Sequence, residues 1–291
     1  MTIENKKEKI MRSIKQNIRS EKVNRVGIIL DKPLPNKFVD QIDPFLLIHH
    51  WDNELQGGQS QKEVGVGPHP HRGFSPVTVI FKGGIQHRDS RGNNSVVTEG
   101  GTQWMFAGKG ITHSERPLKE LAENGGTLEF IQFWVNVSAK NKMEQPYYKA
   151  IQKDETSTYL SDDKKVQVAV VSGEFNGVKG KVDTHTPIYT LKFNFIKEGL
   201  NLRNFVNLGM DYPVTIYIIE DKIYVTTEVF DDNGVTIGKI TLNNWAVDPN
   251  PIIAYDRNYN DFAFEVIDSD LIPRMQIILR PNNVIFIGGY Y

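Results

Sequence analysis

The sequence predicts an all-β protein built from antiparallel sandwiches or barrels and divided into two domains of similar build. From residue 36 onward, short apolar or alternating segments are separated by Gly, Asn and Asp, which is typical of strands joined by turns. Segments with a helical period are few. A polar stretch, Ser138–Tyr148, separates two such sets of strands. Strands at this density favour antiparallel packing over an alternating α/β fold.

In the first half, apolar segments predict four strands, and the Gly- and Asn-rich segments between them predict turns. The strands are expected at 77–81, 95–97, 103–106 and 127–137. The turns are expected at 82–84, 89–94 and 99–101. Gly108 and Gly110 then interrupt the chain before His113. They do not open a predicted helix, so we do not interpret them as a phosphate-binding loop.

The second half repeats the pattern of short strands. The strands are expected at 166–171, 187–195, 214–219, 222–229, 235–242, 262–266 and 275–279. The run Asp231–Gly234 predicts a hairpin turn between two of them.

The same patterns suggest domain boundaries. We expect a polar N-terminal extension at 1–35, a first domain at 36–137, a linker at 138–150 and a second domain at 151–291. The stretch Met1–Arg25 is polar and basic and lacks the apolar core of a secretory signal. It predicts a solvated helix or a frayed extension, and a basic interaction arm is the alternative.

Composition narrows the class of function. The chain has 291 residues, of which 39% are hydrophobic and 24% charged, as in an ordinary globular protein. A formal net charge of -1 argues against a dedicated nucleic-acid surface. The absence of cysteine excludes disulfides and thiolate metal sites and is compatible with a cytoplasmic location. No apolar run approaches the roughly 18 residues that span a bilayer, so no membrane partner is expected.

Two pairs of metal-ligand residues are the most informative feature of the chain. Side chains two residues apart on a strand point to the same face, so His69 and His71 form one pair and His113 and Glu115 another. On neighbouring strands they would offer three imidazoles and one carboxylate to a divalent ion such as iron, nickel, manganese or cobalt. The alternative is two unrelated surface pairs. The second half has a single histidine, His185, and is expected to lack such a site.

A series of ordered motifs covers about residues 40–148. The motifs are Asp43–Leu47, His69–Phe74, His87–Ser90 with Gly92 and Asn93, Gln103–Met105, Ala107–Ile111, His113–Glu115 and Gln132–Asn136. Together they resemble the pirins, a bicupin branch of the cupin superfamily. The resemblance implies two cupin-type antiparallel β-barrels (jelly rolls) that face one another, with a metal ion in the N-terminal barrel. It also implies the metal ligands, which are His69, His71, His113 and Glu115.

The resemblance further implies a function. Fe(II) is the usual ion, with Ni, Mn, Co, Cu and Zn as alternatives. Some pirins resemble quercetin 2,3-dioxygenases, so a flavonol such as quercetin and O₂ are the expected substrates, with carbon monoxide released. In that reaction Glu115 is the expected catalytic residue, taking the flavonol hydroxyl proton. The alternative is a metal- or redox-sensing regulatory protein that acts on a protein partner. A third class is an enzyme that uses the same ligands for hydrolysis or isomerisation.

Two departures from the pirin pattern affect the surroundings of the predicted site. Ser75 and Pro76 stand where the family has Glu-Thr, so we expect metal binding to persist while the cavity wall changes. The chain ends at Tyr291 without the tail containing Tyr-Gly-Pro-Phe, so we expect the two halves to be fastened in another way.

Other residues have both a functional and a structural interpretation. The candidate cavity walls are Phe74, Trp104, Met105 and Phe106, each of which is equally compatible with the barrel core. His87 could support a ligand or line the cavity mouth, but a solvated loop position is favoured. His49 and His50 are adjacent, so at most one of them points inward. Structural or surface roles are expected for both, and His185 is expected in a loop.

Overall fold

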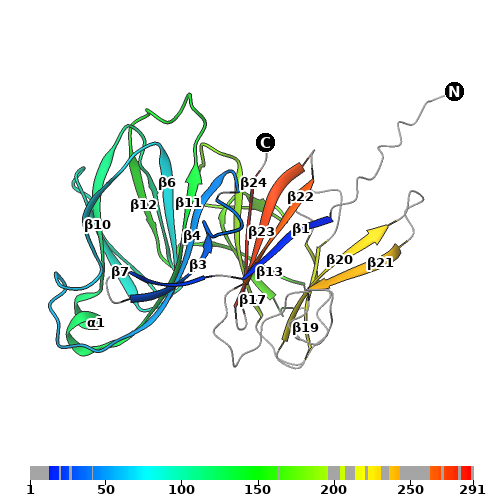
Figure 1. Ribbon diagram of the computed structural model, residues 1–291, viewed down its shortest axis with the longest axis horizontal. Helices are drawn as coiled ribbons and strands as arrows, with labels where there is room; N and C mark the ends of the chain where they lie inside the picture. The colour runs from blue at the N-terminus through cyan, green and yellow to red at the C-terminus, as the bar shows by residue number, and fades with distance from the viewer. Residues whose placement is uncertain are drawn as a thin grey trace.

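The computed structural model describes the chain in separate stretches. The described ranges are 13–19, 21–25, 28–40, 42–162, 164, 166–195, 204–206, 214–219, 222–230, 236–242, 263–269, 272–280 and 283–289. Within them the secondary structure is almost entirely strand, with one short helix, α1 (Lys119–Asn124). Figure 1 shows these strands gathered in two lobes. The predicted all-β fold is confirmed, and none of the helical residues described could form a membrane-crossing helix.

The first lobe consists of a seven-stranded and a four-stranded antiparallel sheet. In spatial order, the larger sheet contains β12 (Tyr147–Ile151), β9 (Thr102–Phe106), β6 (Phe74–Lys82), β11 (Gly126–Asn136), β4 (Phe45–Leu55), β3 (Ile28–Leu34) and β2 (Glu21–Arg25). The smaller sheet contains β5 (Val66–His71), β10 (Ile111–Pro117), β7 (Gly84–Asp89) and β8 (Asn94–Thr98). The four strands predicted in this half correspond to β6, β8, β9 and β11.

Alternation along β11 shows how the larger sheet separates a core from a cavity. Ile131 and Phe133 are fully buried in an apolar cluster on one face of the sheet. Phe130, Gln132 and Trp134 alternate with them and line a cavity on the other face. Since successive side chains of a strand point to opposite faces, one strand serves both the core and the cavity.

The second lobe repeats this arrangement of a seven-stranded and a four-stranded sheet. The larger sheet contains β1 (Ser13–Arg19), β22 (Ala263–Ser269), β23 (Ile272–Arg280), β24 (Asn283–Gly289), β17 (Ile188–Phe195), β14 (Val166–Ser172) and β13 (Ser157–Leu160). The smaller sheet contains β18 (Asn204–Val206), β19 (Val214–Ile219), β20 (Lys222–Phe230) and β21 (Thr236–Leu242). A two-stranded ribbon, β15 (Glu174–Phe175) with β16 (Val178–Lys179), accompanies them.

Each of the seven strands predicted in the second half overlaps one of these strands. The turn predicted at 231–234 lies outside the described residues, but its flanking strands, β20 and β21, pair in antiparallel register. Several strands were not predicted because their apolar positions are interrupted by polar residues. Among them are β1, β2, β3, β12 and β13. Strand β24 was also not predicted, although its sequence contains an uninterrupted apolar run.

The N-terminal segment differs from the expected solvated helix or frayed extension. Residues 13–19, 21–25 and 28–34 form three strands, and residues 1–12 lie outside the described part of the chain. The first strand, β1, pairs with β22 of the second lobe, whereas β2 and β3 extend the large sheet of the first lobe. Leu30 and Leu34 are almost fully buried. These buried side chains and the backbone hydrogen bonds between paired strands keep the segment in the sheet, although its composition is polar. This segment therefore connects the two lobes.

The predicted linker also contributes to the first lobe. Its last residues belong to β12, which pairs with β9 along Tyr147–Ile151. Beyond it, Val171, Val182 and Ile188 of the second half join the same buried cluster as Phe133 of the first half. The Thr186 hydroxyl donates to the Asn136 carbonyl oxygen over 2.7 Å at the same boundary. A shared apolar core therefore joins the two halves.

Candidate metal centre

The predicted metal-ligand pairs lie on neighbouring strands of the smaller sheet in the first lobe. Strands β5 and β10 are antiparallel, and their register places His69 opposite His113 and His71 opposite Ile111. The register shifts between His113 and Glu115, so a β-bulge changes the direction of the side chains at the end of β10. Pairing of these two strands is what brings together residues more than forty positions apart in sequence.

The three histidines form a compact cluster. One ring nitrogen from each of His69, His71 and His113 lies within 4.8 Å of the others. The ring centroids are 4.8 Å apart for His69–His71, 4.4 Å for His69–His113 and 4.9 Å for His71–His113. His113 is 2% exposed, and the other two are partly buried. This spacing allows three imidazoles to meet at a single cation.

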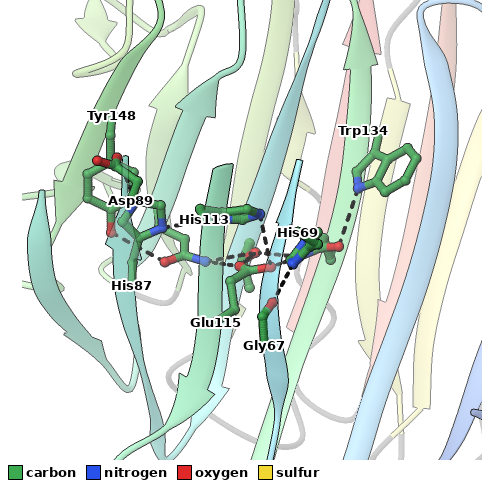
Figure 2. A network of polar contacts seen from close by, with 11 residues as sticks. Gly67, His69, His87, Asp89, His113, Glu115, Trp134 and Tyr148 are labelled. Atoms are coloured by element: carbon green, nitrogen blue, oxygen red, sulfur yellow. Dashed lines mark hydrogen bonds and ion pairs between the residues drawn. The ribbon is translucent and has the colours of Figure 1, made fainter. Parts of the chain in front are cut away.

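Hydrogen bonds determine which ring nitrogens remain available. His69 Nδ1 lies 2.8 Å from the Gly67 carbonyl oxygen and must donate to it, so Nε2 keeps its lone pair (Figure 2). His113 Nε2 is buried and has no hydrogen-bond partner among the side chains and backbone that the structure describes. A buried polar atom without a partner is costly, so this nitrogen is suited to bind a ligand.

Glu115 lies beside the histidine cluster. Its Oε2 is 4.0 Å from His113 Nε2, and the residue is 8% exposed. The carboxylate accepts hydrogen bonds from Gln132 Nε2 at 2.9 Å, from Thr78 Oγ1 at 3.3 Å, and from Gln103 Nε2. These donors come from three strands of the opposite sheet. They fix the carboxylate at the edge of the cluster.

The ring environment keeps two of the histidines neutral. Burial, together with the nearby His69 and His87, lowers the pKa of His113 to about 3 against the opposing effect of Asp89. Burial likewise lowers the pKa of His71 to about 4, with help from His113 and His69 against the opposing effect of Glu115. Neutral imidazoles are the form that binds metal, so these two need lose no proton above about pH 4.

A second layer of polar residues lies behind His113. His87 is fully buried rather than in a solvated loop, and its Nδ1 lies 3.3 Å from His113 Nδ1. Its Nε2 lies 2.9 Å from Asp89 Oδ2 (Figure 2). Burial alone would raise the pKa of Asp89, but hydrogen bonds from His87, Asn93 and the backbone N–H of Arg91 hold it below its usual value.

Tyr148 connects this layer to the carboxylate. Its ring stacks on His87 with centroids 3.7 Å apart and an interplanar angle of 6°. Its hydroxyl accepts from Ser95 Oγ at 2.8 Å and donates to Gln103 Oε1 at 3.3 Å. Gln103 Nε2 in turn donates to Glu115. The sequence analysis gave neither residue a role: Gln103 stood within one motif of the pirin resemblance, and Tyr148 fell in the predicted linker.

The cluster opens onto a cavity of about 880 Å³ between the two sheets. His69, His71 and Glu115 line it on one side. Aromatic rings line much of the remainder, and they belong to Trp51, Phe74, Phe130 and Trp134. The rings of Phe74 and Trp134 lie 4.6 Å apart, and those of Trp51 and Phe130 stack at 5.4 Å.

Of the four residues considered as cavity walls, Phe74 is the one that lines this cavity. Trp104 belongs to the apolar cluster on the other face of the large sheet. Met105 packs with Ala107 and Ile111, and the Phe106 ring stacks on His185 with centroids 4.1 Å apart. These three therefore serve the core.

The remaining histidines lie away from the three-histidine cluster. His49 lines the cavity, whereas His50 points to the opposite face, where its Nε2 lies 3.1 Å from Glu129 Oε1. His50, Asp52 and Glu129 form a second group with mutually close donor atoms. His185 lies in a loop, as expected, with its Nε2 2.9 Å from Glu144 Oε2.

Ser75 and Phe74 point to opposite sides of β6, because they are adjacent on the strand. Ser75 is 4% exposed, and Phe74 lines the cavity. The substitution of Glu-Thr by Ser75 and Pro76 therefore places the unusual Ser75 side chain away from the cavity.

Comparison with known proteins gives consistent matches. A family model described as Pirin matches residues 27–135. A pirin-like protein of Arabidopsis thaliana is 40% identical over 152 residues, which are 52% of this chain and 46% of that protein. A Pseudomonas aeruginosa protein named "Putative quercetin 2,3-dioxygenase" is 34% identical over 202 residues, 69% of this chain and 69% of that one. The match thus spans about half the length of the plant relative and over two thirds of the bacterial one.

Solved structures share the fold. A quercetin 2,3-dioxygenase from Acinetobacter baumannii has a TM-score of 0.64 and 22% identity, covering 97% of this chain and 88% of that chain. A pirin from Escherichia coli in complex with nickel(II) has a TM-score of 0.50 and 17% identity, covering 93% of this chain and 95% of that chain. At these identities the likeness shows the common fold of both lobes.

Proposed function

Because the chain belongs to the pirin family, we propose that its first lobe holds a divalent metal ion and uses it to cleave flavonols such as quercetin with O₂. The proposed ligands are His69, His71, His113 and Glu115. The observation that carries the proposal is the convergence of three imidazoles at the wall of an aromatic cavity. The name of the Pseudomonas relative supports the choice of substrate.

The donor set fits a divalent ion. A cation in front of His113 Nε2 would satisfy a buried lone pair that no described group satisfies. Three neutral imidazoles and one carboxylate leave a net charge of about +1 around a divalent ion, with coordination positions left for substrate or water. We propose Fe(II) because the reaction consumes O₂. Nickel(II) is the first alternative, since the E. coli pirin was solved with it.

The bound ion would act as a Lewis acid that lowers the pKa of the flavonol 3-hydroxyl. Glu115 is suited to accept that proton on Oε2, since this oxygen lies near the histidine cluster and the residue lines the cavity. Gln132 and Gln103 hold the carboxylate in place through their hydrogen bonds to its two oxygens. The histidine lone pairs would be bound to the ion and so could not take the proton.

The cavity suits a flat aromatic substrate. Its volume of about 880 Å³ falls within the range of small-molecule sites. The faces of Phe74, Trp134 and Phe130 would contact the fused rings and exclude water from the reactive carbons. Since the proposed ligands form one side of the cavity, a ligand with one oxygen-bearing edge would enter with that edge toward His69 and His71.

The test measures metal content and turnover in the same preparation. Protein loaded anaerobically with Fe(II) should bind about one ion per chain, and after addition of quercetin and O₂ it should release one carbon monoxide per quercetin consumed. The His71→Ala variant should lose both metal and turnover. Protein loaded with Ni(II) under the same conditions would establish which ion supports the reaction.

The different negative results separate the parts of the proposal. A wild-type protein that binds no divalent ion would contradict the metal site. A loaded protein that consumes no quercetin would contradict the dioxygenase activity and favour a metal-sensing regulatory protein. That alternative would then be tested by capture of a protein partner with the Fe(II) and Fe(III) forms.

A further inference from the structure

We propose that His87 is a positioning residue that fixes the tautomer of His113, so that the lone pair of His113 Nε2 faces His69 and His71. Asp89 sets the direction of this chain of hydrogen bonds, and Tyr148 holds the His87 ring in place. The proposal rests on the metal site proposed above and names residues that the ligand motif does not include.

The direction follows from what each group can donate. An ionised carboxylate accepts hydrogen bonds and cannot donate them, so His87 Nε2 must carry the hydrogen directed at Asp89 Oδ2, 2.9 Å away. A His87 ring whose hydrogen is on Nε2 presents a lone pair at Nδ1. It faces His113 Nδ1 at 3.3 Å and accepts that hydrogen. With its hydrogen on Nδ1, His113 has the Nε2 lone pair that a metal requires.

Asp89 is fixed by the turn between β7 and β8. Its Oδ1 accepts from the backbone N–H of Arg91 at 2.9 Å and of Asn93 at 3.0 Å. Its Oδ2 accepts from His87 and, at 2.7 Å, from Asn93 Nδ2. With four donors directed at it, the carboxylate has one position. The hairpin predicted at 89–94 thus sets the orientation of a histidine that lies inside the sheet.

Tyr148 contacts two parts of the polar network, His87 and Gln103 (Figure 2). Its ring covers the His87 ring at 3.7 Å, which prevents the imidazole from rotating out of line with His113. Its hydroxyl donates to Gln103 Oε1, which turns the Gln103 amide hydrogens toward Glu115. One residue from β12 therefore orients the carboxylate and the second-layer histidine together.

Replacement of Asp89 by asparagine should reverse the chain of hydrogen bonds. Two backbone N–H groups require an acceptor at the Oδ1 position, so the amide introduced by Asp89→Asn would direct its NH₂ group at His87 Nε2, and the Asn93 amide would turn its oxygen toward that NH₂ group. His87 would then carry its hydrogen on Nδ1 and donate to His113 Nδ1. His113 would be left with a hydrogen on Nε2, where the lone pair is needed.

The first measurement is the histidine tautomer in the metal-free protein, by long-range ¹H–¹⁵N NMR. In the wild type we expect the Nδ1–H form of His113 and the Nε2–H form of His87. In Asp89→Asn both should invert. A wild-type His113 with its hydrogen on Nε2 would overturn the inference, whether or not the protein binds metal.

The second measurement is Ni(II) affinity against a competing chelator. Asp89→Asn and His87→Phe, which keeps a ring to stack on Tyr148, should each weaken binding about 10- to 100-fold, the usual effect of removing a group that orients a ligand. Arg91→Ala changes an exposed side chain of the same turn while keeping the backbone N–H, and it should bind as the wild type does. Thermal unfolding of each metal-free variant checks the fold.

The outcomes distinguish this inference from the proposed function. Wild-type affinity in both Asp89→Asn and His87→Phe would refute the role of His87 while leaving the metal site intact. A wild type that binds no Ni(II) or Fe(II) would instead refute the metal site, and the tautomer measurement would still decide the direction of the hydrogen bonds.

Discussion

His113 is the residue on which the first lobe concentrates its polar interactions. It is almost fully buried, it lies between His69 and His87, and its Nε2 borders Glu115. Burying so many polar groups is unfavourable unless their hydrogen bonds are satisfied. The network supplies partners for nearly all of them and leaves the Nε2 lone pair for a ligand.

Glu115→Gln separates metal binding from turnover. Because the three histidines remain, part of the metal affinity should persist, whereas flavonol cleavage should fall at least about 100-fold with the loss of the base. Metal analysis and quercetin consumption on the same sample measure both effects. Glu120→Gln, an exposed change on α1, is the control and should behave as wild type. Unchanged turnover in Glu115→Gln would refute the role of this carboxylate.

The buried histidines predict a pH dependence of stability in the metal-free protein. The pKa of His113 is lowered to about 3 and that of His71 to about 4, against about 6.5 in an unfolded chain. Between these values the unfolded chain binds more protons than the folded one. The free energy of unfolding should therefore decrease as the pH falls from about 6.5 to about 3 and level off below that pH.

Urea unfolding at pH 7 and pH 5 measures this dependence. The double variant His71→Gln/His113→Gln should show a smaller difference between the two pH values than the wild type does, because it lacks the two groups. An equal difference in both proteins would mean that other groups cause the pH dependence.

At the scale of secondary structure, the connection between β9 and β10 positions the histidine cluster because its backbone lies close to the end of β5. Gly108 has φ 45°, and its carbonyl oxygen accepts from the backbone N–H of Gly73, which follows β5. The next residue, Lys109, donates to the Glu144 carbonyl oxygen at 2.9 Å. The connection thereby links the ends of β5 and β10 at the point where the histidines of the two strands meet.

Gly108→Ala should be costly for two reasons. The left-handed backbone disfavours a side chain, and the added Cβ would collide with the Glu144 carbonyl oxygen. We expect a loss of more than about 2 kcal/mol in the free energy of unfolding, together with weaker metal binding. Gly58→Ala has a similar φ of 73° but open space around the Cβ, so it should cost only about 1 kcal/mol. Equal losses in urea unfolding would rule out the collision.

For the whole molecule, the important feature is the joining of the two lobes. The buried cluster that contains Phe133 of β11 also contains Ile188 of β17 and Val171 of β14. The N-terminal segment adds a second connection, since β1 pairs with the second lobe and β2 with the first. We therefore expect the two lobes to unfold together.

Ile188→Ala tests this coupling. The residue is 2% exposed, so its truncation should lower the free energy of unfolding by about 2 to 4 kcal/mol. Measured in a Trp245→Phe background, fluorescence from the tryptophans of the first lobe should still report one transition, shifted to lower urea concentration. Leu160→Ala, at a position 45% exposed, is the control and should cost well under 1 kcal/mol. A first-lobe transition that does not move in Ile188→Ala would show that the lobes unfold independently.

Local patterns in the sequence were sufficient to predict the strand content and the three histidines that the structure brings together. Alternation and turn residues define strands, and a spacing of two places His69 with His71 on one face. The same patterns did not predict β1 and β12, because neither has a strong apolar alternation and both depend on a partner strand.

Only the tertiary structure shows which residues surround the three histidines. The sequence left His87 open between support of a ligand and a solvated loop, and Tyr148 gave no signal, because each acts through a contact between distant segments. The choice between cavity wall and core for Phe74 and Trp104 likewise depended on which face of each strand turned inward. Local sequence sets the period of a strand, but the packing of the whole chain selects which of its two faces becomes the site.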